Sequence, residues 1–434
     1  MPDTAIAKVI ARRVWDSRGR PTVEADVHVA CGAVGRAIAP AGASRGSREA
    51  IDLRDGGERL GGMDVSRAVA HVNGEIAQRL GGMDVTRQLE IDQALGALDG
   101  TGNKARLGGN ATVAVSMACL HAAAQTAGEP LWRYLAQDRP VRLPLPEIQI
   151  FGGGAHAGRR IDIQDLMVMA LSAASFDEAL AMTAEVYRAA GSLMAERGLL
   201  QGVADEGGFW PAFSSNEEAL EILVRAIERA GYRPGEQVGI SLDIAASEFG
   251  RQGRYRLALE ERELDSVEMA GLLIDWCRRF PIVSIEDPLA EDDTPGMALF
   301  TAAVGDTVQI IGDDYLVTNA SLVREAAREA ACNAVLIKPN QAGSMTETLA
   351  ALNAGRNAEF GTIVSARSGE TEDVTIVHLA VGWDAGQLKV GSFSRSERMA
   401  KWNEALRIEE ALGAQARFAG RDALARNPAR RPST

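Results

Sequence analysis

The segment VQIIGDDYLVTNASLVREAAREAACNAVLIK (308–338) sets the pattern for the second half of the chain. In it, a short apolar run ends at Asp313, a helical stretch follows, and a second apolar run ends at Lys338. Other apolar runs end in the same way, on Asp243, Glu286, Arg367 and Lys389. The steps between these positions match one strand, one helix and two loops. Since a (β/α)8 barrel keeps its chemistry at the C-terminal ends of its strands, this spacing predicts such a barrel.

The three acidic strand ends predict a metal site. Carboxylate oxygens from Asp243, Glu286 and Asp313 suit Mg²⁺, which prefers hard oxygen ligands. The alternative is that each acid only caps the helix that follows it. Three acids on neighbouring strands, followed by strands that end on lysine, favour the metal site.

The basic strand ends predict an anion-binding pocket with a general base. Lys338 ends a buried apolar strand, where desolvation would lower its pKa and make it a usable base. The alternative is a structural ion pair between Lys338 and one of the acids. Arg367, Ser368 and Lys389 around the same mouth would bind a carboxylate and a phosphate-like group.

Two loops add candidates for the site. AGASRGSREA (41–50) is rich in small and hydroxyl residues and predicts a mobile lid, whose Ser44 could reach a metal or a phosphate. DEGGFWP (205–211) places Glu206 before two glycines, where it is either part of a turn or a general acid.

The first third of the chain follows a different pattern. Short β-rich runs fill residues 5–40, and helical patterns fill 63–135, which predicts an α+β domain. We expect domain boundaries at 1–138 for this domain and 143–418 for the barrel. Residues 419–434 are rich in Arg and Pro and are expected to form a disordered, basic tail.

Bulk composition excludes several partners. The 434 residues carry a net charge of −13, which argues against nucleic acid or an anionic membrane as the main partner. No apolar run is long enough to cross a membrane, and the N-terminus lacks the layout of a signal peptide. With four scattered cysteines, we expect a cytoplasmic protein with free thiols.

Ten motifs along the chain together resemble the enolase family. They are PAGASRGSREAIDLRDG, GNKARLGGNATVAVSMA, GGGAHAG, GVADEGGFWP, SLDIAASEF, IVSIEDPL, GDDYLVTN, LIKPNQAGSMTET, SARSGETED and LKVGSFSRSERMAKWN. The resemblance covers nearly the whole chain. It implies a small α+β domain on a modified α/β barrel, a homodimer or higher homo-oligomer, two Mg²⁺ ions, and dehydration of 2-phosphoglycerate to phosphoenolpyruvate.

The resemblance also implies a role for each site residue. The implied catalytic residues are Lys338 as the base at C2, Glu206 as the acid at the C3 hydroxyl, Asp165 and His156. The implied metal ligands are Asp243, Glu286 and Asp313 for one ion and the lid residue Ser44 for the second. The implied substrate contacts are Arg367, Ser368, Lys389, Gln164 and the position of Ala366.

The chain departs from the family pattern where the substrate would lie. Asp165 replaces a glutamate of the family motif and is one methylene shorter, and Ala366 replaces a histidine. Trp210 and Val390 stand where a small residue and a threonine are usual, and the loop around His156 is rearranged. Retained ligands and base with altered substrate contacts predict the same elimination on a different substrate.

We therefore expect an Mg²⁺-dependent lyase acting on a small phosphorylated or phosphonylated carboxylate. One such reaction converts 2-phosphonoformylglycerate to carboxyphosphonoenolpyruvate in phosphonate-antibiotic biosynthesis. One alternative is an ordinary enolase of glycolysis. The other is a non-catalytic binding protein on the same scaffold, which the retained Lys338, Glu206 and acid trio disfavour.

Overall fold

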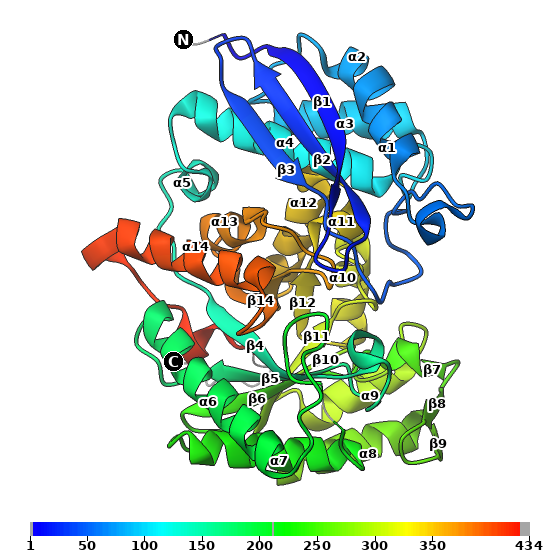
Figure 1. Ribbon diagram of the computed structural model, residues 1–434, viewed down its shortest axis with the longest axis vertical. Helices are drawn as coiled ribbons and strands as arrows, with labels where there is room; N and C mark the ends of the chain where they lie inside the picture. The colour runs from blue at the N-terminus through cyan, green and yellow to red at the C-terminus, as the bar shows by residue number, and fades with distance from the viewer. Residues whose placement is uncertain (1–2, 211, 426–434) are drawn as a thin grey trace.

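The computed structural model describes residues 3–210 and 212–425, which form a small α+β domain on a closed barrel (Figure 1). The N-terminal domain is drawn in blue and cyan, and the barrel with its helices fills the lower part of the view. This is the predicted fold class, an α+β domain followed by a modified TIM-type barrel.

The N-terminal domain is a three-stranded antiparallel sheet covered by helices on one side. Its elements are β1 (Ile6–Trp15), β2 (Pro21–Val29), β3 (Val34–Ile38), η1 (Arg59–Gly62), α1 (Ser66–His71), η2 (Val72–Ile76), α2 (Ala77–Leu80), α3 (Gln88–Asp99), α4 (Gly109–Ala127) and α5 (Leu131–Ala136). Small residues let α4 pack closely on the sheet, since a Cβ at Gly35 would lie 2.0 Å from the carbonyl oxygen of Ala118. The buried helix expected from the small, apolar stretch in this region is α4.

Eight strands close the barrel in the order β10-β11-β12-β13-β14-β4-β5-β6. They are β4 (Leu145–Gly152), β5 (Asp165–Ala170), β6 (Val238–Asp243), β10 (Ile282–Glu286), β11 (Gln309–Gly312), β12 (Ala334–Ile337), β13 (Gly361–Ser365) and β14 (Gly386–Ser392). Strand β5 runs antiparallel to both neighbours, whereas the other contacts in the barrel are parallel. The first residue of β5, Asp165, therefore pairs with the last residue of β6, Asp243, at the same rim.

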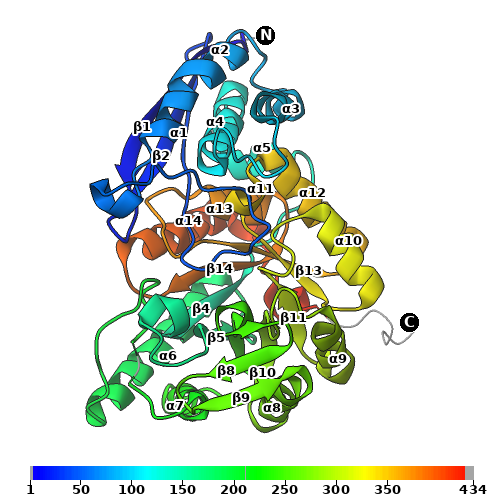
Figure 2. The ribbon, with the colours of Figure 1, turned by 90° about the vertical axis from the view of Figure 1, so that its right-hand side faces the viewer.

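Helices surround the barrel, and a small sheet lies outside it beside α8 (Figure 2). The helices are α6 (Phe176–Glu196), α7 (Asn216–Arg229), α8 (Ser266–Arg279), α9 (Thr294–Val304), α10 (Ala320–Glu329), α11 (Pro339–Ala342), α12 (Met345–Asn357), α13 (Thr375–Gly382) and α14 (Ser396–Leu412). The outer strands are β7 (Gly250–Arg251), β8 (Arg254–Leu257) and β9 (Arg262–Asp265), and the short 3-10 turns are η3 (Gly154–Ala157), η4 (Ala246–Glu248), η5 (Gly413–Gln415) and η6 (Gly420–Ala423). Within the described ranges, no helix is both long and apolar enough to span a bilayer.

The start of the expected disordered tail is ordered. Ala423 accepts a hydrogen bond from Gln387 Nε2 at 3.0 Å, and the backbone N–H of Ala425 donates to Gln309 Oε1 at 3.0 Å. Ala423 and Leu424 also pack on apolar residues at the closed end of the barrel. The expectation of disorder from residue 419 was therefore wrong for 419–425. Two apolar side chains and two hydrogen bonds hold this segment on the barrel, although its sequence shows no apolar face. Residues 426–434 lie outside the described residues.

Candidate active site

A cavity opens at the C-terminal rim of the barrel, under the loop 42–44. Most of the predicted site residues line it, namely Ser44, His156, Gln164, Asp165, Glu206, Asp243, Lys338, Ala366, Arg367, Ser368 and Lys389. The remaining two, Glu286 and Asp313, are in contact with the lysines of the cavity wall. The strand-end pattern thus brings together side chains from distant parts of the sequence.

Two buried lysines hold the three acids. Lys389 Nζ lies 2.9 Å from Asp243 Oδ2 and 2.8 Å from Glu286 Oε2. Lys338 Nζ lies 2.5 Å from Asp313 Oδ2. Each acid therefore contacts a cation in this structure, and the predicted helix-capping role is not needed to explain its position.

The acids provide too much buried negative charge for these lysines alone. Burial and Asp243 raise the pKa of Glu286 well above its usual range. Its Oε1 is buried without a hydrogen-bond partner among residues 3–210 and 212–425. An unpartnered carboxylate oxygen in an all-oxygen donor set fits a hard cation such as Mg²⁺. The residues present therefore fit the metal that the sequence predicts.

The clusters whose possible ligand atoms lie closest together are not the predicted trio. In the described part of the chain, the groups close enough to share one ion are Asp287 with Asp313 and Asp314, and His156 with Asp165 and Glu206. The carboxylate of Asp287 already accepts the backbone N–H groups of Asp313 at 2.9 Å and Asp314 at 2.7 Å. Asp287 therefore braces the backbone that carries Asp313. The trio of Asp243, Glu286 and Asp313 stays a prediction.

The expected lowering of the Lys338 pKa was wrong for this state. Burial does lower it, but the adjacent Asp313 carboxylate outweighs burial and raises the pKa of Lys338. The ion pair weighed as an alternative is therefore present. Lys338 also lines the cavity, and a role as base requires the neutral amine, which forms only when Asp313 no longer raises this pKa.

The lid loop is fastened to the predicted anion holders. Arg367 makes a bidentate ion pair with Glu49 at 3.0 and 3.1 Å, and it donates to the Ser44 carbonyl at 2.9 Å. The hydroxyl of Ser368 accepts the backbone N–H of Ala43 at 2.6 Å. The lid therefore lies closed on Arg367 and Ser368. A metal contact by the Ser44 hydroxyl stays a prediction.

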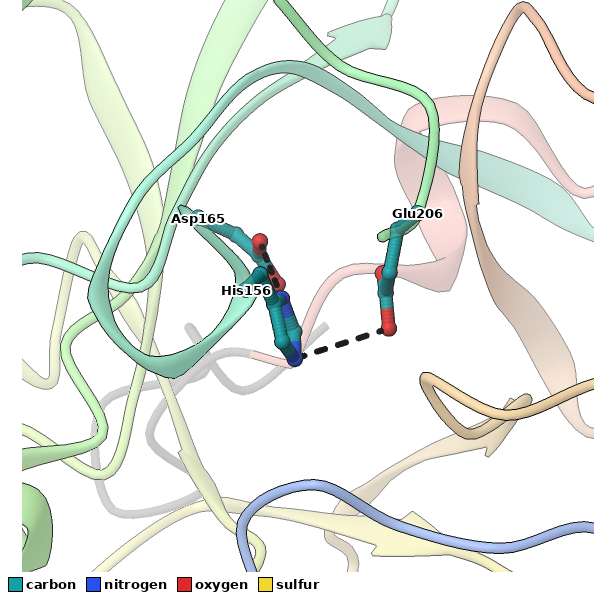
Figure 3. Close-up of side chains that lie close together, drawn as sticks. All are labelled: His156, Asp165 and Glu206. Atoms are coloured by element: carbon teal, nitrogen blue, oxygen red, sulfur yellow. Dashed lines mark hydrogen bonds and ion pairs between the residues drawn. The ribbon is translucent and has the colours of Figure 1, made fainter. Parts of the chain in front are cut away.

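A histidine joins two acids on the opposite wall (Figure 3). His156 Nδ1 lies 3.3 Å from Asp165 Oδ1, and its Nε2 lies 3.9 Å from Glu206 Oε1. Burial disfavours the imidazolium, but Glu206 and Asp165 outweigh it and raise the pKa of His156 to about 9. Burial raises the pKa of Glu206, although His156 opposes it. The arrangement suits a cationic His156 between Asp165 and Glu206.

Four buried or half-buried residues of the site were missed by sequence reasoning. Arg18 donates to the Ser368 hydroxyl at 3.1 Å, and Glu49 holds Arg367. Arg398 donates to the backbone carbonyls of Arg367, Val390 and Ser368. The fourth is Gln149, which contacts Asp165. Glu49 and Arg398 lie in motifs that were recognised and Arg18 does not, but an isolated polar residue carries no signal of a partner hundreds of positions away.

Three of the departures from the family pattern line the cavity, and Trp210 does not. Asp165, Ala366 and Val390 line it directly. Trp210 instead packs beside Gly158, and the guanidinium of Arg160 lies 5.7 Å from its ring. Trp210 therefore supports the rearranged loop that carries His156.

Comparison with known families agrees with this geometry. Residues 6–135 match the enolase N-terminal domain, and residues 140–427 match the enolase C-terminal TIM barrel domain. Together the two matches span both domains of the fold and every residue of the cavity wall. The chain therefore belongs to the enolase family.

Proposed function

We propose that the protein is an Mg²⁺-dependent hydro-lyase that removes water from a 2-substituted glycerate and gives an enolpyruvate. The observation that carries this proposal is that Lys338 and Glu206 line the same cavity as the anion holders Arg367 and Lys389. A base, an acid and cations around one small cavity are what an elimination next to a carboxylate needs. The enolase-family membership supports the same reaction class.

In the proposed mechanism, Lys338 accepts one proton and Glu206 donates another. Arg367 and Ser368 hold the anionic group on the C2 oxygen, and Lys389 holds the carboxylate side. In its neutral form, Lys338 takes the proton from C2, and the substrate carboxylate holds the electron pair of that bond until the pair forms the C2–C3 double bond. Hydroxide leaves C3 and receives the proton of Glu206, so that water departs. Burial raises the pKa of Glu206, which favours the protonated form that this step needs.

Asp243, Glu286 and Asp313 would hold the metal in this proposal, and Ser44 would contribute to a second ion. Bound Mg²⁺ supplies positive charge that neutralises these carboxylates and stabilises the charge developing on the substrate carboxylate. Excess chelator should therefore abolish turnover. Turnover that persists in chelator would contradict the metal assignment.

We further propose that the substrate differs from 2-phosphoglycerate. Ala366 lines the cavity where the family has a histidine, and we propose that the space it leaves takes a larger group on the C2 oxygen, such as the phosphonoformyl group of 2-phosphonoformylglycerate. The test is kcat/KM of the unmodified protein on both compounds with Mg²⁺. A value of about 10⁵ M⁻¹s⁻¹ or more on 2-phosphoglycerate would identify an ordinary glycolytic enolase. Absence of turnover on either would support a binding role.

The proposal includes a homodimer or higher homo-oligomer, as the family resemblance implies, and a cytoplasmic location, as the scattered cysteines suggest. Light scattering after size-exclusion chromatography would measure the oligomeric state. A mass near that of the 46.1 kDa chain would contradict the dimer.

A further inference from the structure

Gln149 is a buried amide on β4 at the edge of the proposed active site. Its backbone lies where the pairing of β4 with β5 is irregular, between Gln149 and Phe151. Such irregularities re-aim side chains and often lie beside active sites. The Ser392 hydroxyl donates to the Gln149 carbonyl at 2.6 Å and fixes this part of the strand. Gln149 therefore points from a rigid strand rather than from a loop.

The side-chain amide of Gln149 bridges two segments of the site. Its Oε1 accepts the backbone N–H of Gly208 at 2.7 Å, and its Nε2 donates to Asp165 Oδ1. Because one partner can only donate and the carboxylate can only accept, the orientation of the amide is fixed. A Cβ at Gly208 would lie 2.4 Å from Gln149 Oε1, so only glycine permits this approach.

These contacts complete a ring of interactions that includes Asp165, His156 and Glu206. Asp165 faces His156, and His156 faces Glu206, as Figure 3 shows. Gly208 follows Glu206 by two positions in the same loop, and Gln149 connects this loop back to Asp165. The length of the Gln149 side chain therefore helps to set the distance between the two carboxylates that His156 joins.

We propose that Gln149 is a positioning residue whose long side chain is matched to the short side chain of Asp165, so that the amide holds Asp165 and the Glu206 loop at a fixed separation. This inference rests on the proposed role of Glu206 as the acid. A glutamate at position 165 would extend into space that Gln149 and His156 fill, and overpacking of a buried site is destabilising. Shortening Gln149 would instead withdraw the amide by about one C–C bond, and a displacement of about 1 Å can lower a rate roughly a hundredfold.

The test exchanges the side-chain lengths at positions 149 and 165. Gln149→Asn and Asp165→Glu would be made singly and together, and the double variant keeps the total number of methylene groups between the strands. We expect each single variant to lower the rate of water loss by roughly ten- to a hundredfold. The double variant should recover at least about tenfold over the poorer single variant. Effects that simply multiply in the double variant would overturn the proposal.

A second readout does not need turnover. The pKa of His156 can be followed by NMR of labelled imidazoles in the ligand-free protein, which has five histidines. Each single variant should move the His156 titration, and the double variant should return it to the wild-type position. A His156 titration unchanged by Gln149→Asn would also overturn the proposal. If the titrations follow this pattern but no variant or wild-type protein turns over any glycerate, the proposed function fails and the positioning role stands.

A matched control is Gln387→Asn. Gln387 is also a buried barrel glutamine, but its amide bonds to Gln309 and Ala423 at the other end of the barrel. The same shortening there should leave the His156 titration and the rate of water loss unchanged. Thermal unfolding of every variant separates a loss of positioning from a loss of fold.

Discussion

The two ends of the barrel bury polar groups in opposite ways. At the closed end, Gln309 and Gln387 exchange two hydrogen bonds of 2.9 Å. Gln309 Oε1 also accepts the backbone N–H of Ala425, and Gln387 Nε2 also donates to the Ala423 carbonyl. The other N–H of Gln309 donates to the Ser284 hydroxyl at 3.1 Å. At the open end, charged side chains are buried together, and within the described residues Glu286 Oε1 and Glu147 Oε1 have no hydrogen-bond partner.

The difference separates stability from function. A neutral network in which each group has a partner stabilises a core. Buried charges with missing partners reduce stability unless a ligand completes them. The closed end thus stabilises the fold, and the open end is where we propose that a cation and an anion bind. Substitutions at the two ends should have different consequences, and the predictions below compare them.

The largest expected effect is loss of the base. Lys338→Ala should lower exchange of the C2 proton with solvent by at least about a thousandfold, because no other group is proposed to take that proton. Deuterium incorporation from D₂O, followed by NMR with Mg²⁺ present, measures this. Gln387→Ala at the closed end is the control and should exchange normally. Exchange retained in Lys338→Ala would place the base elsewhere.

Loss of the acid should separate the two steps of the reaction. Glu206→Gln should reduce the loss of water by about a hundredfold or more, because the amide cannot protonate the leaving oxygen. Exchange at C2 should continue, since Lys338 remains. The comparison needs deuterium incorporation and product formation measured on one sample. Equal losses in both rates would show that Glu206 acts before or during removal of the C2 proton.

A third prediction concerns stability at the open end. Burial raises the pKa of Glu147 to about 7, although Lys389 opposes it. The folded chain therefore holds this proton more tightly than the unfolded chain, and stability falls as the pH rises from about 4.5 to about 7. Glu147→Gln should stabilise the metal-free protein by up to about 3 kcal/mol at pH 8 and by almost nothing at pH 4.

Urea unfolding at both pH values, with chelator present, checks this prediction. An equal effect at pH 4 and pH 8 would mean that the variant acts through packing and not through charge.

The smallest expected effect lies at the closed end. Gln387→Ala removes the two hydrogen bonds that Gln387 and Gln309 exchange and should destabilise the fold by about 1–3 kcal/mol, while kcat and KM stay unchanged. Thermal unfolding and steady-state kinetics of this variant provide the measurement. A loss of activity without a loss of stability would contradict the separation between the two ends.

The barrel and its charged rim were predictable because strand ends recur at regular intervals. Asp243, Glu286, Lys338 and Lys389 each follow from an apolar run and its last polar residue. The direction of β5 was not predictable, because an isolated strand pattern carries no direction. That reversal brings Asp165 to the rim at the start of its strand.

The other features of the site could not be predicted, because they depend on contacts between segments that are distant in the sequence. Gln149 and Arg18 are single polar residues, and their partners Asp165 and Ser368 become neighbours only in the folded chain. The Lys338 pKa was misjudged because burial was considered without the nearby Asp313. Ordering of 419–425 depends on two glutamines at the closed end, which the tail sequence does not reveal.

The most direct measurement of the central claim is deuterium exchange at C2 by the unmodified protein. A panel of 2-substituted glycerates that includes 2-phosphoglycerate would be incubated in D₂O with Mg²⁺ and with chelator, and followed by NMR. We expect Mg²⁺-dependent exchange, faster on a glycerate with a larger C2 substituent than on 2-phosphoglycerate. Absence of exchange on every compound with Mg²⁺ present would contradict a catalytic role for the open end of the barrel.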